Sequence, residues 1–203
     1  MTSLRSGVKL TLMKKLSTCL FLVLFSFSAP TFADDISEFE IEGISIGDSM
    51  LDFFSEEEIK NNIKLDYFSP IQNKTFNLTE LNKFPFFEIY DALQIVFKTN
   101  DKKYKIYGLH GVKDFDDINN CYKKLDKIAE EFSEMFKNAE KNDFKFLKLS
   151  EDKDIGTYSG VTFYLKFGIA SAHCTDYSKE MPYIDNLRIN LKTQEYEDWL
   201  WIE

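Results

Sequence analysis

The chain has 203 residues, of which 44% are hydrophobic and 16% aromatic, enough apolar side chains to fill the core of one domain. It carries 34 acidic against 25 basic residues, a formal net charge of -9. An acidic balance disfavours nucleic acid as a partner, because contacts to phosphates require an excess of lysine and arginine. It also disfavours binding to anionic lipid surfaces.

The first feature along the chain is a secretion signal within 1–33. A basic pair follows Met13, an apolar run reaches Phe27, and small residues lead to Ala33. This arrangement is typical of a bacterial signal peptide, so we expect cleavage after Ala33, with Met13 as an alternative translation start. The apolar run of about a dozen residues is shorter than the ~20 needed to cross a bilayer. An uncleaved anchor helix stays open as the alternative.

Removal of this leader would deliver 34–203 as a single domain to the periplasm or the exterior. The leader holds four basic residues and no acid, so 34–203 keeps 21 basic and 34 acidic residues, a net charge of about -13. No later apolar run approaches the length of a membrane helix. We therefore expect no membrane span in the mature chain.

Before residue 113 the sequence predicts short elements separated by turn residues. We expect a short strand, a short helical segment and a hairpin of two strands, over 38–46, 49–62, 86–98 and 104–112 respectively. The helical segment contains Ser55-x-x-Glu58, which is the spacing of a capping box. Residues 64–85, punctuated by proline and asparagine, predict no regular element.

The clearest helix covers about 116–137. Its apolar residues recur at spacings of three and four, the core-facing stripe of an amphipathic helix: Ile118, Cys121, Leu125, Ile128, Phe132 and Met135. Beyond it, we expect strands over 144–149, over 157–175 with a turn or bulge at Gly168, and over 187–192; apolar residues alternate over 161–167 and 187–191. The tail from Thr193 predicts a terminal helix, with a last strand as the alternative. The predicted fold class is α+β, an antiparallel sheet of about five to seven strands with the 116–137 helix packed on one face.

Two cysteines remain after the leader, Cys121 and Cys174. Thiols in an oxidising compartment usually pair, so we expect a disulfide between them, with two buried free thiols as the alternative. Only two histidines, His110 and His173, are present in the sequence. A zinc site needs three or four ligands at recognisable spacing, so we expect no metal and no cofactor.

A short stretch, Gly43-Ile44-Ser45-Ile46-Gly47-Asp48-Ser49 followed by Asp52, resembles the strand-turn-helix opening of small bacterial envelope lipoproteins that assist outer-membrane protein assembly. The resemblance covers about 15 residues. It departs from that pattern at Asp48, where methionine is usual, and in lacking the lipid-bearing cysteine. What the resemblance implies is an α+β envelope adaptor, and it transfers no functional residue.

The functional expectation is a binding or interaction protein of the cell envelope, with an unknown protein or small molecule as partner. The aromatic residues Tyr196, Trp199 and Trp201 form a candidate interaction anchor, since tyrosine and tryptophan dominate interface hot spots. The alternative is that these residues close the core.

Enzymatic activity is left open, but the absence of known catalytic motifs favours a role without it. The sequence has no Gly-x-Ser-x-Gly elbow, no His-Glu-x-x-His and no glycine-rich phosphate loop, and no residue qualifies as catalytic. One alternative is a hydrolase-like enzyme with a carboxylate site, for which Asp116-Asp117 and Glu197-Asp198 are the adjacent acid pairs. Another is a structural or inhibitor-like envelope protein.

Overall fold

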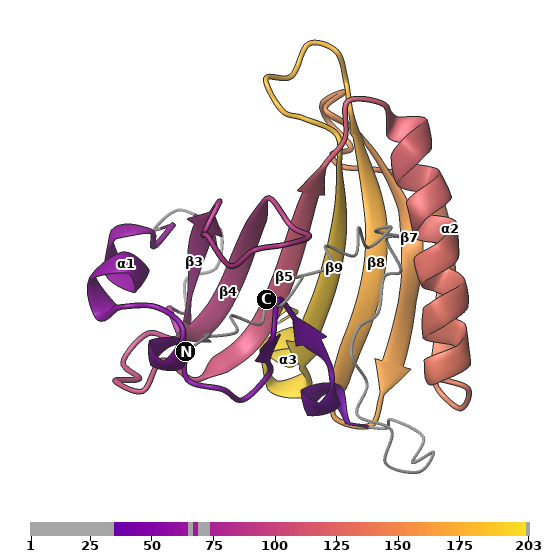
Figure 1. Ribbon diagram of the computed structural model, residues 1–203. Coiled ribbons are helices and arrows are strands. Elements are labelled where there is room, and N and C mark those ends of the chain that lie inside the picture. Colours follow the sequence, from indigo (N-terminus) through magenta and orange to yellow (C-terminus); the bar gives the residue numbers. More distant parts are fainter. Residues whose placement is uncertain (1–34, 65–66, 69–73, 202–203) are drawn as a thin grey trace, which may run out of the picture. The chain divides into compact units, whose positions relative to one another are not determined.

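The computed structural model describes residues 35–64, 67–68 and 74–201 and has an α+β architecture (Figure 1). A seven-stranded antiparallel sheet is accompanied by a two-stranded sheet and by several helical segments. The expected leader, 1–33, lies outside the described residues. Within the described ranges, no helix is long and apolar enough to cross a membrane.

The seven strands follow the order β3-β4-β5-β9-β8-β7-β6, and each neighbouring pair is antiparallel. Two meanders, β3 to β5 and β6 to β9, meet where β5 pairs with β9. Helix α2 connects the two meanders along the chain. The strand bounds are Phe76–Asn82 (β3), Ala92–Lys98 (β4), Ile106–Asp114 (β5), Glu140–Lys148 (β6), Gly156–Leu165 (β7), Gly168–Tyr177 (β8) and Asn186–Thr193 (β9).

The two-stranded sheet replaces the single strand that the sequence predicts over 38–46. Its strands β1 (Glu40–Ile41) and β2 (Ile44–Ser45) are separated by a tight turn. Glu42 and Gly43 both have positive φ in this turn, 54° and 75°. A residue with positive φ cannot continue an extended strand, so the chain reverses there.

The helical segments are η1 (Ile36–Glu38), η2 (Met50–Asp52), α1 (Glu56–Asn61), α2 (Ile118–Met135) and α3 (Gln194–Leu200). The predicted helical segment near 49–62 is therefore divided into η2 and α1. The capping box of α1 is formed as predicted, since the Ser55 hydroxyl accepts from the Glu58 N–H and the Glu58 carboxylate accepts from the Ser55 N–H.

The two faces of the large sheet differ in chemistry because side chains alternate along each strand. One face, here called the apolar face, packs against α2 and the N-terminal segments; its side chains include Ile95, Leu109, Phe163, Ala172, Cys174, Leu187, Ile189 and Leu191. Helix α2 runs along β8 on this side (Figure 1). The opposite face, here called the polar face, carries the alternate residues of the same strands.

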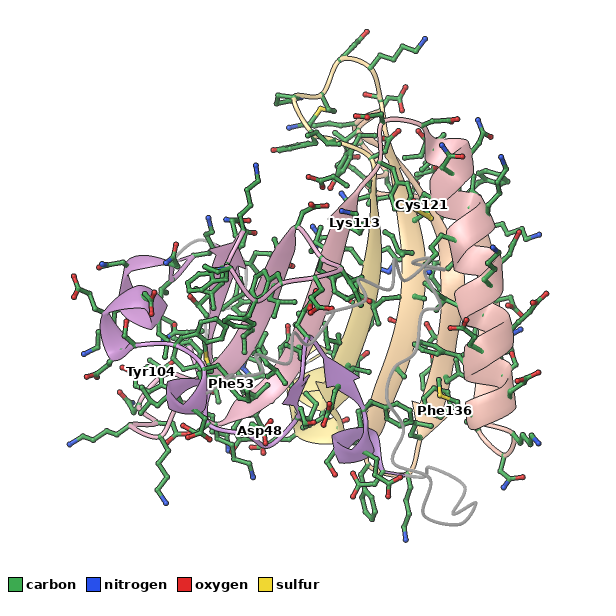
Figure 2. The ribbon with its side chains drawn as sticks, in the orientation of Figure 1. Asp48, Phe53, Tyr104, Lys113, Cys121 and Phe136 are labelled. Carbon is green, nitrogen blue, oxygen red and sulfur yellow. A yellow bond between two sulfur atoms is a disulfide. The ribbon has the colours of Figure 1, made fainter. Side chains whose placement is uncertain are left out.

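Cys121 on α2 and Cys174 on β8 are placed as a disulfide, with a Cα–Cα distance of 6.0 Å. Cys121 lies on the side of α2 that faces the strands (Figure 2). Both cysteines are fully buried in the apolar core. The predicted pair thus has disulfide-compatible geometry, and the bond would tie α2 to the centre of the sheet.

Candidate functional site

The polar face carries a row of polar side chains at matching register across all seven strands. Antiparallel pairing aligns one residue from each strand, in spatial order Glu80, Gln94, His110, Asn190, Ser171, Thr162 and Asn142. Four adjacent members, from Gln94 to Ser171, are buried. Buried polar groups are costly unless they are hydrogen-bonded, so the partners of these groups are informative.

Asn190 is the centre of this hydrogen-bond network. Its Oδ1 lies 2.9 Å from His110 Nδ1, and its Nδ2 lies 3.0 Å from Ser171 Oγ and 3.3 Å from His173 Nδ1. Since Asn190 Oδ1 can only accept and Nδ2 can only donate, this arrangement assigns the proton of His110 to Nδ1 and that of His173 to Nε2.

Both histidines are held in the neutral form. Burial, together with the positive charges of Lys192 and Arg188, lowers the pKa of His110 to about 3. Burial and the same two cations lower the pKa of His173 to about 3. The network therefore combines neutral imidazoles, an amide and a hydroxyl beside fixed cations.

Arg188 is the only arginine in 34–203 and lies half-buried on β9, directly across from His173 on β8. Its Nη1 donates to Gln94 Oε1 at 2.8 Å and its Nε to Asn186 Oδ1 at 3.2 Å. Among the residues that the structure describes, no carboxylate lies within 4.0 Å of its guanidinium. Two neutral amide oxygens orient this cation and leave its charge uncompensated by an ion pair.

Two other charged groups of the polar face, Glu80 and Lys192, have ion-pair partners. Gln94 Nε2 donates to Glu80 Oε2 at 2.7 Å, and Lys64 lies 3.2 Å from Glu80 Oε1. Burial raises the pKa of Glu80, but these contacts outweigh it and leave that pKa below its ordinary value. Lys192 forms an ion pair with Glu197 of α3.

Aromatic rings border the network on the side of β6 and β7. The Tyr158 ring lies 5.9 Å from the His173 ring and 5.3 Å from the Phe144 ring. Tyr164, further along β7, is 43% exposed. Near the end of β8, the rings of Tyr177 and Tyr183 lie 5.1 Å apart. Among the described residues, the part of the polar face that α3 does not cover thus carries one arginine and several partly exposed tyrosines.

Helix α3 covers the other end of the polar face, where it divides the predicted interaction anchor. Tyr196 and Trp199 are 3% and 4% exposed and pack with Phe76 and other residues in a second hydrophobic cluster. Trp201 is 77% exposed, and its indole donates to Glu197 Oε1 at 2.9 Å. Two of the three anchor residues therefore close a core, and only Trp201 presents its ring to solvent.

The acid pairs considered for a hydrolase have local structural partners. Asp117 caps the N-terminus of α2, where hydrogen bonds from Asn119 lower its pKa. Glu197 pairs with Lys192, and Asp198 accepts from Gln194 at 2.7 Å. Within the described part of the chain, no group of three or more histidine, cysteine or acidic residues could hold a metal ion.

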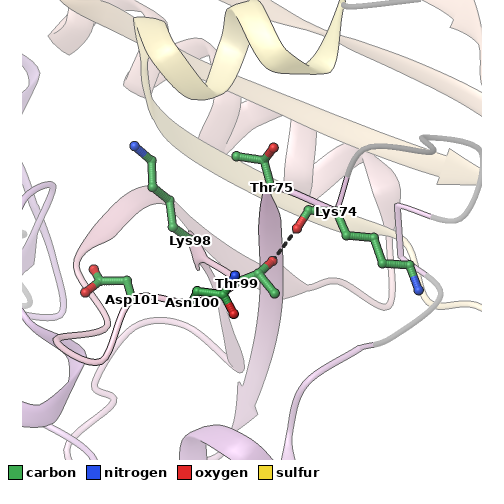
Figure 3. Close-up of a pocket in the computed structure, with 6 residues that line it drawn as sticks. All are labelled: Lys74, Thr75, Lys98, Thr99, Asn100 and Asp101. Carbon is green, nitrogen blue, oxygen red and sulfur yellow. Dashed lines mark hydrogen bonds between the residues drawn. The ribbon is translucent and has the colours of Figure 1, made fainter.

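A shallow cavity of about 550 Å³ lies beside the β3 and β4 ends (Figure 3). Its lining residues are Lys74, Thr75, Lys98, Thr99, Asn100 and Asp101. The Lys98 ammonium pairs with Glu195 at 2.6 Å, and the Thr99 hydroxyl donates to the Lys74 carbonyl. These groups are engaged with the chain itself, so the polar face is the stronger candidate site.

No family model matches the chain, and neither the curated proteins nor the solved structures include a match. The stretch from Gly43 to Asp52, which resembles the envelope lipoproteins, forms β2, a glycine turn and the capped start of η2. These are local features that many folds use.

The sequence placed the members of the polar network in strands but did not indicate that they form a network. His110 and His173 were considered only as candidate metal ligands, and Arg188 and Asn190 lie within the strand predicted over 187–192 without an assigned role. One sequence signal was available: the last 170 residues contain both histidines and a single arginine. Only the pairing of β5, β9 and β8 brings them together.

Proposed function

We propose that this chain is an exported binding protein of the bacterial cell envelope and that the polar face is its binding surface. The observation that supports the proposal best is the convergence of both histidines and Arg188 on one side of the sheet. The opposite side is occupied by the core and by α2, which in this proposal acts as an amphipathic helix backing the strands. One face would then hold the fold together while the other carries recognition.

The compartment follows from the leader and the cysteines. An exported chain enters an oxidising environment. There, two thiols with the geometry of Cys121 and Cys174 would form a disulfide bond. Expression of the full chain in a bacterium, fractionation and mass spectrometry of the periplasmic form should give a protein that begins at Asp34 and lacks two thiol hydrogens. Retention of residues 1–33, or reduced thiols in the cytosol, would contradict the proposal.

Binding can be tested with a photo-crosslinking amino acid. In the native envelope, p-benzoyl-phenylalanine in place of Tyr164 on the polar face should give an adduct of discrete mass. The matched control is the same replacement of Lys127, an exposed residue on the outer side of α2. Adducts at Tyr164 and none at Lys127 would support the polar face; equal yields, or none at Tyr164, would refute it.

A further inference from the structure

Resting on this proposed function, we infer that the polar face recognises a protein partner by receiving an aspartate or glutamate side chain of that partner on Arg188. The inference names the partner's chemistry, an acidic side chain presented within a protein interface.

The first argument is the unmatched charge of Arg188. A half-buried cation loses part of its hydration and normally regains that energy from a carboxylate. Here Gln94 and Asn186 supply only neutral oxygens, while Lys192 and Lys64 have carboxylate partners of their own. Asp114, also on this face, interacts with the charge of Arg188 at longer range, but no carboxylate of the described residues lies within 4.0 Å of the guanidinium. Among the described residues Arg188 therefore has no contacting carboxylate, and a partner could supply one.

The second argument is orientation. Nη1 and Nε of Arg188 each hold one hydrogen bond, so the guanidinium plane is fixed against the sheet. A fixed guanidinium loses less side-chain freedom when a carboxylate binds it, and arginine matches carboxylate geometry better than lysine. The chain uses lysine at nearly every other basic position, so an arginine at this one suits a planar acceptor.

The third argument is the aromatic border. Protein interfaces are enriched in tyrosine and arginine, and their hot spots combine these residues. Tyr158 and Phe144 lie beside His173, which is the register partner of Arg188, and Tyr164 and Tyr183 are 43% and 59% exposed. These rings lie on the β6 and β7 side of Arg188, whereas its guanidinium reaches toward Gln94 on β4, so they would contact a protein that spans the face and would not enclose the ion pair itself. A small free anion would make no use of these rings.

The arginine can be observed directly. In the ¹⁵N-labelled full chain with Arg5→Lys, Arg188 is the only source of a guanidinium Nε–Hε cross-peak in an NMR spectrum. We expect decaglutamate to shift this cross-peak in a saturable manner, whereas inorganic phosphate and decaserine at matched ionic strength leave it in place. An unmoved cross-peak, or one that moves with phosphate alone, would overturn the inference.

A variant separates this inference from the proposed function. Arg188→Gln should weaken decaglutamate binding tenfold or more and reduce the adduct at Tyr164, whereas Lys127→Gln, which removes the same charge from α2, should leave both unchanged. Thermal unfolding of each variant verifies that it is folded, and the cross-peak test on the native arginine does not depend on any variant. An adduct at Tyr164 that survives Arg188→Gln would refute the acidic partner while keeping the binding face; no adduct in any variant would refute the face itself.

Discussion

Acid should destabilise the protein through its two buried histidines before the carboxylates titrate. In the unfolded chain a histidine has a pKa near 6.5, whereas in the folded chain His110 and His173 have pKa values of about 3. Because the folded pKa is depressed, the unfolded chain binds more protons over the window between about 3 and 6.5. The contribution of the two histidines to the free energy of unfolding therefore has its maximum above pH 6.5 and falls as the pH is lowered through this window.

The magnitude follows from the shift. Lowering the pH from 8 to 5 should cost about 2 kcal/mol for each histidine, or about 4 kcal/mol for the pair. Asp114 and Asp176 have raised pKa values, chiefly because of burial, and contribute with the opposite sign. The histidine contribution dominates above pH 5, since ordinary carboxylates titrate below that value.

The assay is urea denaturation at pH 8, 6.5 and 5, with the double variant His110→Gln/His173→Gln for comparison. With a slope of about 2 kcal/mol per molar urea, the native midpoint should fall by about 2 M between pH 8 and pH 5. The variant is expected to lose the same amount of stability at every pH, so its midpoint should change little between pH 8 and pH 5. Parallel declines in both proteins, or histidine ring protons that titrate near pH 6.5 in the folded protein, would refute the reasoning.

Three further predictions concern the stability contributed by other contacts. Reduction of the Cys121–Cys174 pair, which spans 53 residues in sequence, should lower the free energy of unfolding by about 4 kcal/mol; identical urea curves with and without reductant would contradict this. Gly160→Ala should cost about 2 kcal/mol in thermal unfolding, because a Cβ there would overlap a neighbouring backbone carbonyl; an unchanged melting temperature would show that the strand yields. Glu42→Gln should cost about 2 kcal/mol and speed amide exchange at 88–90, whose three N–H groups donate to the carboxylate; unaltered exchange there would argue against this contact.

Local signals in the sequence predicted local structure well. The capping box at Ser55 forms because it needs only residues within one turn of helix. The alternation over 187–192 matches β9, and the alternation over 161–167 falls largely within β7. Each of these patterns is complete within a few consecutive residues, so no knowledge of tertiary pairing is required to interpret them.

Elements that depend on distant partners were harder to predict. Strand β3 occupies 76–82 within the stretch that predicts no regular element, because pairing with β4 overrides the turn preference of its asparagines. The broken strand at Glu42 has a comparable cause. A non-glycine residue with positive φ is uncommon, and this one is fixed by the bonds of its carboxylate to 88–90, over forty residues away.

The polar site is a still stronger case of long-range dependence. Alternation within β5 places His110 and Leu109 on different faces of the sheet. It does not identify which residues of the neighbouring strands pair with His110. That requires the register of β4, β9 and β8, and a shift of one residue would send Asn190 to the apolar face. The same sequence composition would then give a core with a buried amide and no network. The candidate site thus depends on how the strands pair, which the sequence alone does not reveal.

The two faces of the sheet make opposite contributions to stability, which bears on why the network is retained. The apolar face gains from burial, and its cysteine pair is placed to restrict the unfolded chain. On the polar face, buried groups such as Asn190 and His110 give up hydration for hydrogen bonds of modest net value, and aliphatic residues of similar size would be expected to stabilise the sheet at least as well. A chain selected only for stability would gain little from an arginine that contacts no carboxylate of the described residues. The arrangement is better explained if the missing carboxylate belongs to another molecule, since the cost in the free protein is then recovered on binding.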